Sequence, residues 1–368
     1  MKPSYIELSI SSAVCHREIQ SAMTFTIGYA SQPDLYHPRI LLEHAALAER
    51  AGFETLWVSD HFHPWSHTGA QESHTWVFIG AAAARTNKIS FGTAVTCPLF
   101  RYNPAITAQA FASLRAMFPN RIFLGVGSGE AMNEIPVGYE WPSLKERIER
   151  LEEAIRIMKM LWSKDFVTFN GKYYKLRKAN LYTKPETEVP LYVAGFGPKV
   201  AKIAGKYADG FLTTLVDPEK LKNVLLTALT EGAKEAGRDP EKIERAVELG
   251  VSYDQNFDRA IKKVRFWRGN LFPFMFKLPI YDPREIEEMG QMVSDEALAK
   301  SFFIGTKPED ILKPIERAVK MGFNHIYLQS TSPDEEKFLR MAAKEIVPYV
   351  KSTYGTSKRV TTQRRKRS

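Results

Sequence analysis

The sequence predicts an α/β fold, a (β/α)8 TIM barrel with insertions over the barrel mouth. Short apolar runs of strand character alternate with amphipathic helical segments along most of the chain, which implies parallel strands with helices packed outside them. The alternation continues too long for one open sheet, and about eight repeats close a barrel. Polar residues of catalytic type also follow several of the apolar runs, at the strand ends where such barrels place their chemistry.

The first half of the chain accounts for four repeats. The run Glu54-Thr55-Leu56-Trp57-Val58 is apolar and strand-like, and a dense polar and aromatic cluster follows it directly. The strands expected here cover residues 24–29, 55–58, 89–95 and 122–126, and the helices cover residues 38–51, 75–86 and 104–117.

The second half continues the repeat after a helix at 144–162 and a hairpin at 167–174. Asn170-Gly171 in that hairpin is a type I′ turn signal. The segment 266–292 is rich in Phe, Pro and Met and does not fit the repeat, so we expect an insertion that forms a pocket wall. The remaining strands are expected at 191–194, 210–213, 246–252, 301–304 and 325–328.

Composition is that of an ordinary globular protein, with 44% apolar and 25% charged residues in 368. No run approaches the roughly 18 apolar residues that span a bilayer, and Glu7 interrupts the only apolar stretch near the start. Cys15 and Cys97 are too few for a disulfide framework or a thiolate metal site, which agrees with a reducing compartment. We therefore expect a cytoplasmic protein with no membrane partner.

The net charge of +9 is concentrated at the C-terminus. Residues 351–368 hold seven Lys and Arg and no acid, so the rest of the chain carries about +2. We expect this basic tail to be disordered, and we predict no specific nucleic-acid partner. Residues 1–22 show no clear period and are expected to be a flexible extension, with Met23 as an alternative start. The barrel domain is therefore predicted over residues 23–350.

Unusual residues follow the first four predicted strands. In a barrel these strand ends converge on one rim, so positions far apart in the sequence become neighbours. The residues concerned are Asp34 after the first strand, Asp60, His61 and Trp65 after the second, Thr96 and Cys97 after the third, and Gly127 to Glu130 after the fourth.

A metal site is one alternative interpretation of this rim. His61 and His63 form the H-x-H pattern that begins many barrel metallohydrolase sites. Such a site needs three or four convergent ligands, and none of the other histidines follows a later predicted strand. We therefore predict no metal, and keep a metal-dependent hydrolase and a pure coenzyme carrier as lesser alternatives.

Two glycine-containing turns are suited to binding a flat, phosphorylated ligand. In the run Gly125 to Glu130, glycines allow close approach of the backbone, although Glu130 replaces the third glycine of a dinucleotide fingerprint. A carboxyl held there in a partly dry pocket can have a raised pKa and act as an acid. The run Ala194 to Lys199 opens a helix with Pro198 in its first turn, where free N–H groups and Lys199 favour an anion.

With these motifs the chain resembles the luciferase-like TIM barrels, and within them the dehydrogenases that use the deazaflavin coenzyme F420. The resemblance runs from about residue 23 to residue 351. Its most specific segments are residues 59–65 (SDHFHPW), 100–105 (FRYNPA), 119–121 (PNR) and 127–134 (GSGEAMNE).

The resemblance implies a hydride transfer from an alcohol carbon to F420 in the barrel mouth, by a homodimeric enzyme. His61 would take the hydroxyl proton, Glu130 would donate a proton to the reduced ring, Trp65 would shape the pocket, and Asp34 stands where the family commonly has Glu. A cis peptide would join Ala94 and Val95. The coenzyme would contact Asp60, Ala94, Val95, Cys97, Ser128, Gly129, Asn133, Phe196, Gly197, Lys199 and Val200. The substrate would contact Trp65, Thr214, Trp267, Phe276 and Lys277.

The substrate class rests on departures from the branch that acts on glucose 6-phosphate. That branch holds the phosphate with two Lys and one Arg, and the matching positions here are Asp217, Lys277 and Ser301. A carboxylate facing a phosphate disfavours binding. We therefore expect a secondary alcohol, with a glucose-6-phosphate dehydrogenase as the main alternative and a flavin monooxygenase of the same superfamily as a lesser one.

Overall fold

Eight parallel strands form a nearly closed barrel in the computed structural model, which describes residues 25–215 and 217–355. Neighbouring strands pair in the order β3-β2-β1-β11-β9-β8-β7-β4. Single bridges from Phe91 to Ile122 and from Thr96 to Val126 join the two ends of this series. The strands are β1 (Thr26–Ser31), β2 (Thr55–Val58), β3 (Ser90–Thr93), β4 (Leu124–Val126), β7 (Leu191–Ala194), β8 (Gly210–Thr214), β9 (Glu244–Tyr253) and β11 (His325–Ser330). The predicted TIM barrel is confirmed.

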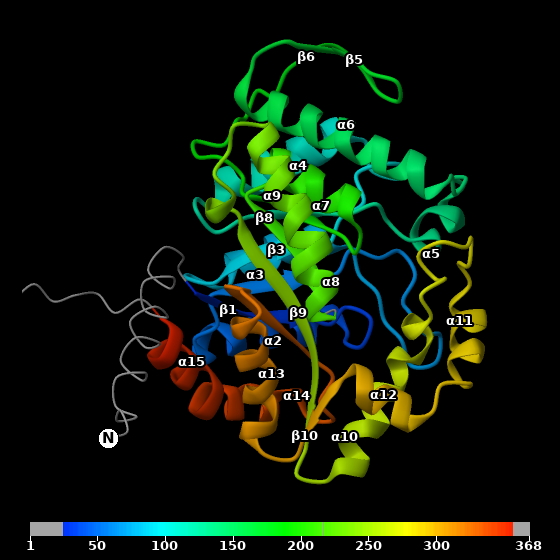
Figure 1. Cartoon of the computed structure of the whole chain (residues 1–368), viewed down its shortest axis with the longest axis vertical. Coiled ribbons are helices and arrows are strands. Elements are labelled where there is room, and N and C mark those ends of the chain that lie inside the picture. The colour runs from blue at the N-terminus through cyan, green and yellow to red at the C-terminus, as the bar shows by residue number, and fades with distance from the viewer. Residues whose placement is uncertain (1–24, 216, 356–368) are drawn as a thin grey trace, which may run out of the picture.

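Helices cover the outside of the barrel (Figure 1). The predicted helices at 38–51 and 104–117 have the expected bounds, and each has a proline in its first turn, where no N–H is needed. The helices are α2 (Pro38–Ala51), α3 (Thr75–Ala84), α4 (Pro104–Met117), α5 (Ala131–Glu134), η1 (Ile135–Val137), α6 (Leu144–Ser163), α7 (Pro198–Tyr207), α8 (Pro218–Lys220), η2 (Leu221–Leu226), α9 (Thr227–Glu235), η3 (Pro240–Lys242), α10 (Phe257–Val264), η4 (Arg265–Leu271), α11 (Pro283–Gly290), α12 (Asp295–Ser301), α13 (Pro308–Lys320), α14 (Glu335–Met341), η5 (Ala342–Ile346) and α15 (Val347–Tyr354).

Aromatic side chains fill the barrel interior below the carboxyl ends of the strands. Trp57 stacks on Tyr327 with ring centroids 4.7 Å apart, and Phe123 and Tyr192 pack against the same indole. Interior residues closer to the carboxyl ends of the strands are small, and Ala94 and Ala194 there are only partly buried. The packed floor therefore supports a mouth with smaller side chains.

The insertion between β9 and the short strand β10 (Phe303–Gly305) forms a second apolar cluster at the mouth. Helix α11 lies on the same side of the molecule as α5, and α15 lies on the other side (Figure 1). Glu287 of α11 accepts N–H groups of His67 and Thr68 at 2.8 and 2.7 Å, which attaches the insertion to the loop after β2. The buried members of the cluster are Trp65, Met132, Val264, Trp267, Met275, Ile286, Leu298 and Phe302.

Two predicted strand features are wrong. Strand β10 (Phe303–Gly305) is not a barrel strand, because it pairs only with the last part of β9, and Ser301 ends helix α12 instead. The hairpin of β5 (Val167–Asn170) and β6 (Lys175–Ala179) exists, but its loop has four residues, 171–174, in place of a two-residue type I′ turn. Glu153 of α6 accepts three consecutive N–H groups of that loop, which holds it open.

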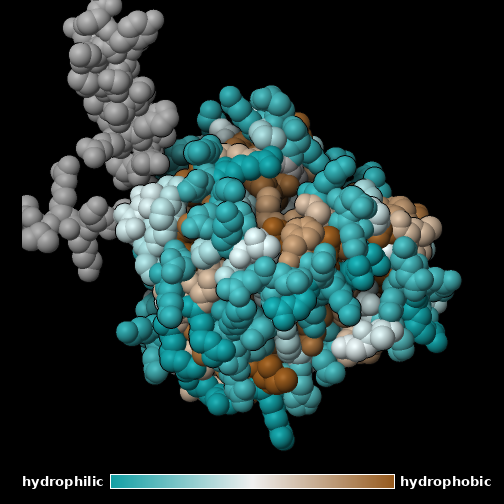
Figure 2. All heavy atoms as spheres, turned by 90° about the horizontal axis from the view of Figure 1, so that it is seen from below, coloured by the Kyte–Doolittle hydropathy of each residue, from teal (hydrophilic) through white to brown (hydrophobic). Residues whose placement is uncertain are grey.

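The predicted domain boundary at residue 350 lies inside α15, which continues to Tyr354. Lys351 donates from Nζ to the carbonyl of Gly52 at 2.7 Å, so this residue belongs to the fold and not to the tail. The predicted extension 1–22, Cys15 and residues 356–368 of the tail lie outside the described residues. Within the described residues, no helix has the length and apolar character to cross a bilayer. The face in Figure 2 is largely hydrophilic, with apolar residues in small separate groups.

Candidate active site

Asp34 ties together the loops after β1 and β2. It is 1% exposed, and its Oδ1 accepts the backbone N–H of Trp65 at 3.2 Å. Its Oδ2 accepts from the hydroxyl of Ser59 at 3.5 Å. The same Oδ1 lies 3.4 Å from Nδ1 of His61. Asp34 therefore orients the imidazole through Nδ1.

His61 is surrounded by carboxyl groups. Its side chain is 10% exposed, and its ring meets Trp65 edge-on at 6.0 Å between centroids. Burial alone would lower the pKa of His61, but the charges of Asp34, Glu130 and Glu72, with the hydrogen bond to Asp34, together outweigh it and raise this pKa to about 9. The imidazole of His61 can therefore take up or release a proton beside the barrel mouth.

Glu130 follows β4 and is oriented by Asn133. The amide of Asn133 donates to Oε2 of Glu130 at 2.9 Å, while its carbonyl oxygen accepts the N–H of Phe62 at 2.8 Å. Asn133 was predicted to bind the coenzyme, but both of its polar ends are used within the protein. It positions Glu130 against the loop after β2.

Ser128 and Gly129 are held from behind by Arg147 of α6. Its guanidinium donates to both of their carbonyl oxygens at 3.3 Å and to the carbonyl of Phe276 at 3.0 Å. Gly129 has a φ of 78°, a conformation that favours glycine. Arg147 thus joins the turn after β4 to the insertion.

Sequence reasoning missed a buried charge network directly below these loops. Arg101 donates to Oδ1 of Asp60 at 3.1 Å and to Oε1 of Glu134 at 2.8 Å. Thr96 and Tyr102 also donate to Asp60. Asp60 and Glu134 are 2% and 0% exposed, so neither carboxylate can face a ligand freely. The sequence does contain an indication of this network, because Arg101 and Glu134 lie inside two of the segments that carry the family resemblance.

Aromatic rings from three strand-end segments form one apolar wall. Phe276 of the insertion lies 5.8 Å from the ring of Trp65 and 5.8 Å from the ring of Phe196. Thr214 is exposed at the end of β8, two residues beyond Leu212 of the barrel interior, so it lies on the interior face. The structure therefore brings Trp65, Phe276 and Phe196 together and places Thr214 at the rim.

Two predicted contact residues have a different role. Trp267 is 2% exposed and donates from its indole to Oγ1 of Thr331 at 2.9 Å, so it is a core residue of the insertion and not part of the pocket surface. Cys97 is 3% exposed, and a Cβ added at Gly129 would lie 2.5 Å from its Sγ. Burial raises the pKa of the Cys97 thiol well above its ordinary value. Cys97 supports the glycine turn from beneath.

The residues present fit a flat, phosphorylated coenzyme. Ala94 and Val95 are joined by a cis peptide bond, as expected, and are partly exposed in the barrel interior, as Ala194 is. Helix α7 begins at Pro198, its N-cap residue Gly197 provides no side-chain cap, and a Cβ at Gly197 would meet nothing within 4 Å. An exposed helix N-terminus of this kind is an anion site.

The other residues of the α7 segment agree with this site. Lys199 is exposed in the first turn of the helix, where its ammonium can approach an anion. Phe196 is 45% exposed, whereas Val200 is 6% exposed and packs beneath Gly195. Lys199 and the N–H groups can therefore contact a phosphate, while Val200 shapes the turn.

At the three positions matching the phosphate site of the glucose 6-phosphate branch, two side chains make hydrogen bonds within the protein and the third is exposed. Asp217 caps α8 by accepting the N–H groups of Glu219 and Lys220 at 3.0 and 3.1 Å. The hydroxyl of Ser301 donates to the carbonyl of Ala297 at 3.1 Å, and Lys277 is exposed. Of these three positions only Lys277 carries a positive charge, whereas the phosphate site of the glucose 6-phosphate branch has three cations.

The two histidines of the H-x-H pattern point to different partners. Nδ1 of His63 lies 3.1 Å from the carbonyl oxygen of Tyr281, whereas His61 faces Asp34. Among residues 25–215 and 217–355, the acid and histidine group with ligand atoms within 4.8 Å of one another is Asp34, His61 and Glu72. Glu72 was not predicted, because an acid in a polar loop is usually solvated.

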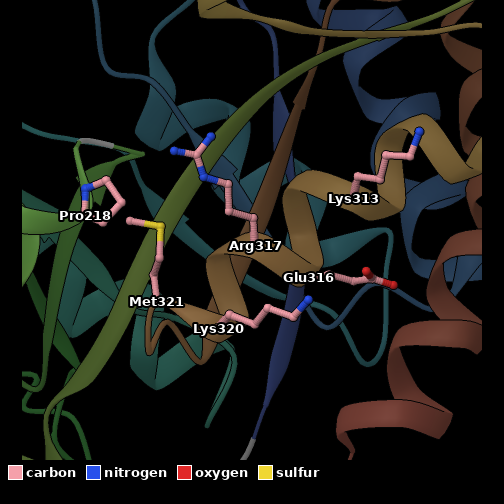
Figure 3. A pocket seen from close by; sticks show the side chains of 6 residues that line it. All are labelled: Pro218, Lys313, Glu316, Arg317, Lys320 and Met321. Atoms are coloured by element: carbon pink, nitrogen blue, oxygen red, sulfur yellow. The ribbon is translucent and has the colours of Figure 1, made fainter.

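A surface hollow of about 420 Å³ lies beside α13 (Figure 3). None of its lining residues is a predicted site residue, so it is separate from the mouth. It is lined by Pro218, Lys313, Glu316, Arg317, Lys320 and Met321.

Comparison with known proteins identifies the family of the chain. The luciferase-like monooxygenase family model matches residues 18–325. An F420-dependent glucose-6-phosphate dehydrogenase of Microbacterium testaceum (strain StLB037) is 38% identical over 328 residues, which cover 89% of this chain and 98% of the relative. The enzyme of the same name from Mycolicibacterium fortuitum is 41% identical over 325 residues, covering 88% and 97%.

Two solved structures extend the comparison. An F420-dependent secondary alcohol dehydrogenase in complex with an F420-acetone adduct is 45% identical, with a TM-score of 0.85 over 88% of this chain and 98% of that chain. The coenzyme F420-dependent tetrahydromethanopterin reductase of Methanopyrus kandleri, 22% identical with a TM-score of 0.72 over 89% and 99%, shares the fold. The chain therefore belongs to the luciferase-like family and, within it, to the F420-dependent dehydrogenases.

Proposed function

We propose that this protein oxidises a secondary alcohol by transferring the hydride of the carbinol carbon to F420. The observation that carries the proposal is the contact of Asp34 with His61 beside the apolar wall of Trp65 and Phe276. A base next to an apolar wall suits a small alcohol. The 45% identity to a secondary alcohol dehydrogenase supports the same substrate class.

Each residue has a defined part in the reaction. Bound F420 supplies the hydride acceptor. Nε2 of His61 takes the hydroxyl proton, and Asp34 holds Nδ1 so that the ring keeps its orientation. Glu130, fixed by Asn133, is the proton donor on the coenzyme side. Trp65 and Phe276 contact the apolar part of the substrate and exclude water.

We assign the coenzyme contacts to two groups of residues. Ala94, Val95, Ser128 and Gly129 contact the ring, and Phe196, Gly197 and Lys199 contact the phosphate end. Asp60, Cys97, Asn133 and Val200 support these groups from behind, because their polar or apolar contacts are made within the protein.

Glucose 6-phosphate is the second candidate substrate. Relatives at 38% and 41% identity are named as glucose-6-phosphate dehydrogenases, and Lys277 is exposed. Against it, Asp217 would place a negative charge where the phosphate needs a cation.

Substrate choice is tested by following the absorbance of oxidised F420. We expect loss of absorbance when isopropanol is added to the protein with F420, and no loss with glucose 6-phosphate. Loss with glucose 6-phosphate alone would mean that the phosphate site has been rebuilt from other residues and would refute the alcohol assignment.

Lys199→Ala should weaken F420 binding by about two- to tenfold, because it removes one partly screened cation at a helix N-terminus. The effect should shrink as salt is added. Lys202→Ala on the same helix is the matched control, since Lys202 pairs with Glu235 at 2.6 Å. Fluorescence titration with F420 measures both constants, and equal affinities of the two variants would remove Lys199 from the phosphate site.

The raised pKa of His61 gives the reaction a pH dependence. A base with a pKa of about 9 is mostly protonated at pH 7, so kcat/KM for alcohol oxidation should rise by about tenfold per pH unit and level off near pH 9. Reduction of acetone by reduced F420 needs the protonated form, so its rate should stay level below about pH 9 and fall above it. Initial rates in both directions from pH 6 to 10 test this, and a flat profile for oxidation would contradict it.

Homodimeric assembly and a cytoplasmic location remain predictions from the sequence.

A further inference from the structure

We propose that Glu72 is the proton-relay partner of His61, exchanging the reaction's proton between Nδ1 of the imidazole and solvent. This proposal rests on the proposed function, because it concerns the same proton. Glu72 acts through His61 and does not contact the substrate, so its role is that of a positioning and relay residue.

The carboxyl of Glu72 has one free oxygen aimed at the imidazole. Its Oε1 accepts the N–H of Ser73 at 3.0 Å. Its Oε2 lies 4.0 Å from Nδ1 of His61, is buried, and has no hydrogen-bond partner among the described residues. The side chain is only 9% exposed. A buried carboxyl oxygen without a donor is unfavourable, and a proton or a donor at that position removes the penalty.

Asp34 and Glu72 differ in how firmly they are held. Asp34 accepts from Trp65, Ser59 and His61, so its orientation is fixed. Glu72 accepts one hydrogen bond through Oε1, and its Oε2, 4.0 Å from Nδ1 of His61, has no hydrogen-bond partner among the described residues. Asp34 therefore orients the ring, and Glu72 is free to take or return the proton.

Glu72 also lies at the solvent edge of the site. It is in the loop between β2 and α3, and its neighbours Gln71 and His74 are exposed. The carboxyl is thus buried on the side of His61 and close to solvent along its own loop. A relay residue needs both properties.

The charges around the pair favour proton sharing. Burial raises the pKa of the Glu72 carboxyl, and the charge of Asp34 raises it further, while His61 opposes the rise. The other acids that act on the pair are Asp60, Glu130 on the turn after β4, and Glu248 on β9. The pKa values of His61 and Glu72 are therefore both raised, and the two groups titrate together because each charge acts on the other.

The relay step balances in both directions. In oxidation the O–H bond of the alcohol breaks, its proton bonds to Nε2, and the hydride leaves carbon for bound F420. The Nδ1–H bond then breaks, its electron pair stays on Nδ1, and the proton bonds to Oε2 of ionised Glu72, which releases it to solvent. Water then takes the proton from Nε2 and returns one to Nδ1, which restores the starting tautomer, so one proton leaves the site per turnover. In carbonyl reduction every transfer is reversed.

Glu72→Gln is the first test, because the amide keeps the shape but cannot carry the proton. We expect unchanged F420 affinity, no loss of unfolding temperature, and a kcat at least about tenfold lower in both directions. Glu288→Gln, which makes the same change at an exposed position of α11, is the matched control and should keep the wild-type rate. A Glu72→Gln enzyme with the wild-type kcat and pH profile would overturn the proposal.

Chemical rescue separates a relay from a packing role. Formate should restore activity to Glu72→Ala, because it places a carboxyl beside Nδ1, and it should not change Glu288→Ala. If Glu72→Ala folds and binds F420 but formate does not restore its activity, the relay is refuted.

A readout independent of turnover separates failure of the relay from failure of the proposed function. Nitrogen-15 NMR of the histidine side chains should show the titration of His61 at lower pH in Glu72→Gln than in the wild type, because a negative charge is lost. An unchanged titration would overturn the relay even if the wild type does not oxidise alcohols.

Discussion

Replacing His61 with alanine is expected to lower kcat for alcohol oxidation by about 10²- to 10⁴-fold, the usual contribution of a general base. The affinity for F420 should be nearly unchanged, because the coenzyme contacts that we assign come from the turns after β3, β4 and β7. Stopped-flow absorbance measures the hydride step, and fluorescence titration measures the binding.

His63→Ala is the control for this experiment. His63 lies two residues away, and its Nδ1 faces the carbonyl of Tyr281 and not the cluster around Asp34. It should keep most of the activity. Equal activity of His61→Ala and the wild type would remove His61 from the mechanism.

Arg101→Met is expected to lower the free energy of unfolding by about 3–5 kcal/mol, because it leaves two buried carboxylates without their common cation. Arg101 is the ion-pair partner of both Asp60 and Glu134, and its own side chain is 9% exposed. Denaturant titration followed by circular dichroism measures the change. We also expect Arg101→Met to bind F420 more weakly, because Asp60 and Glu134 anchor the loops of the mouth.

The deficit of Arg101→Met should grow with pH. Burial already raises the pKa of Glu134, with Arg101 opposing the rise, so loss of Arg101 raises this pKa further. When the pKa of a carboxyl is higher in the folded state than in the unfolded state, the folded state becomes less stable as pH rises. The loss of stability in Arg101→Met should therefore be larger at pH 8 than at pH 5. Arg150→Met, which breaks a partly exposed pair with Glu146, should cost about 0–1 kcal/mol. Equal costs for the two variants would contradict the role of Arg101.

The barrel and the position of the site could be predicted because both depend on local patterns. Apolar runs separated by amphipathic helices define parallel strands, and the carboxyl ends of such strands meet at one rim. Asp34, His61 and Trp65 are therefore neighbours in the structure although Asp34 is far from the other two in the sequence.

Other features depend on contacts that no local pattern contains. Glu72 is an acid in a polar loop, and only the fold shows that its carboxyl is buried beside His61. The apolar character of Trp267 is the same in a pocket wall and in a core, and the insertion uses it as core. The loop after Asn170 is longer than its Asn-Gly signal predicts, because Glu153 of the preceding helix α6 accepts its N–H groups.

The central claim is that the hydride of an alcohol carbon passes to F420, and isotope transfer tests it most directly. Isopropanol deuterated at carbon 2 is incubated with the protein and F420, and the reduced coenzyme is examined by mass spectrometry. The account predicts one deuterium in the reduced coenzyme and a slower rate than with unlabelled isopropanol. Reduced F420 without deuterium, or no reduction by isopropanol at all, would contradict it.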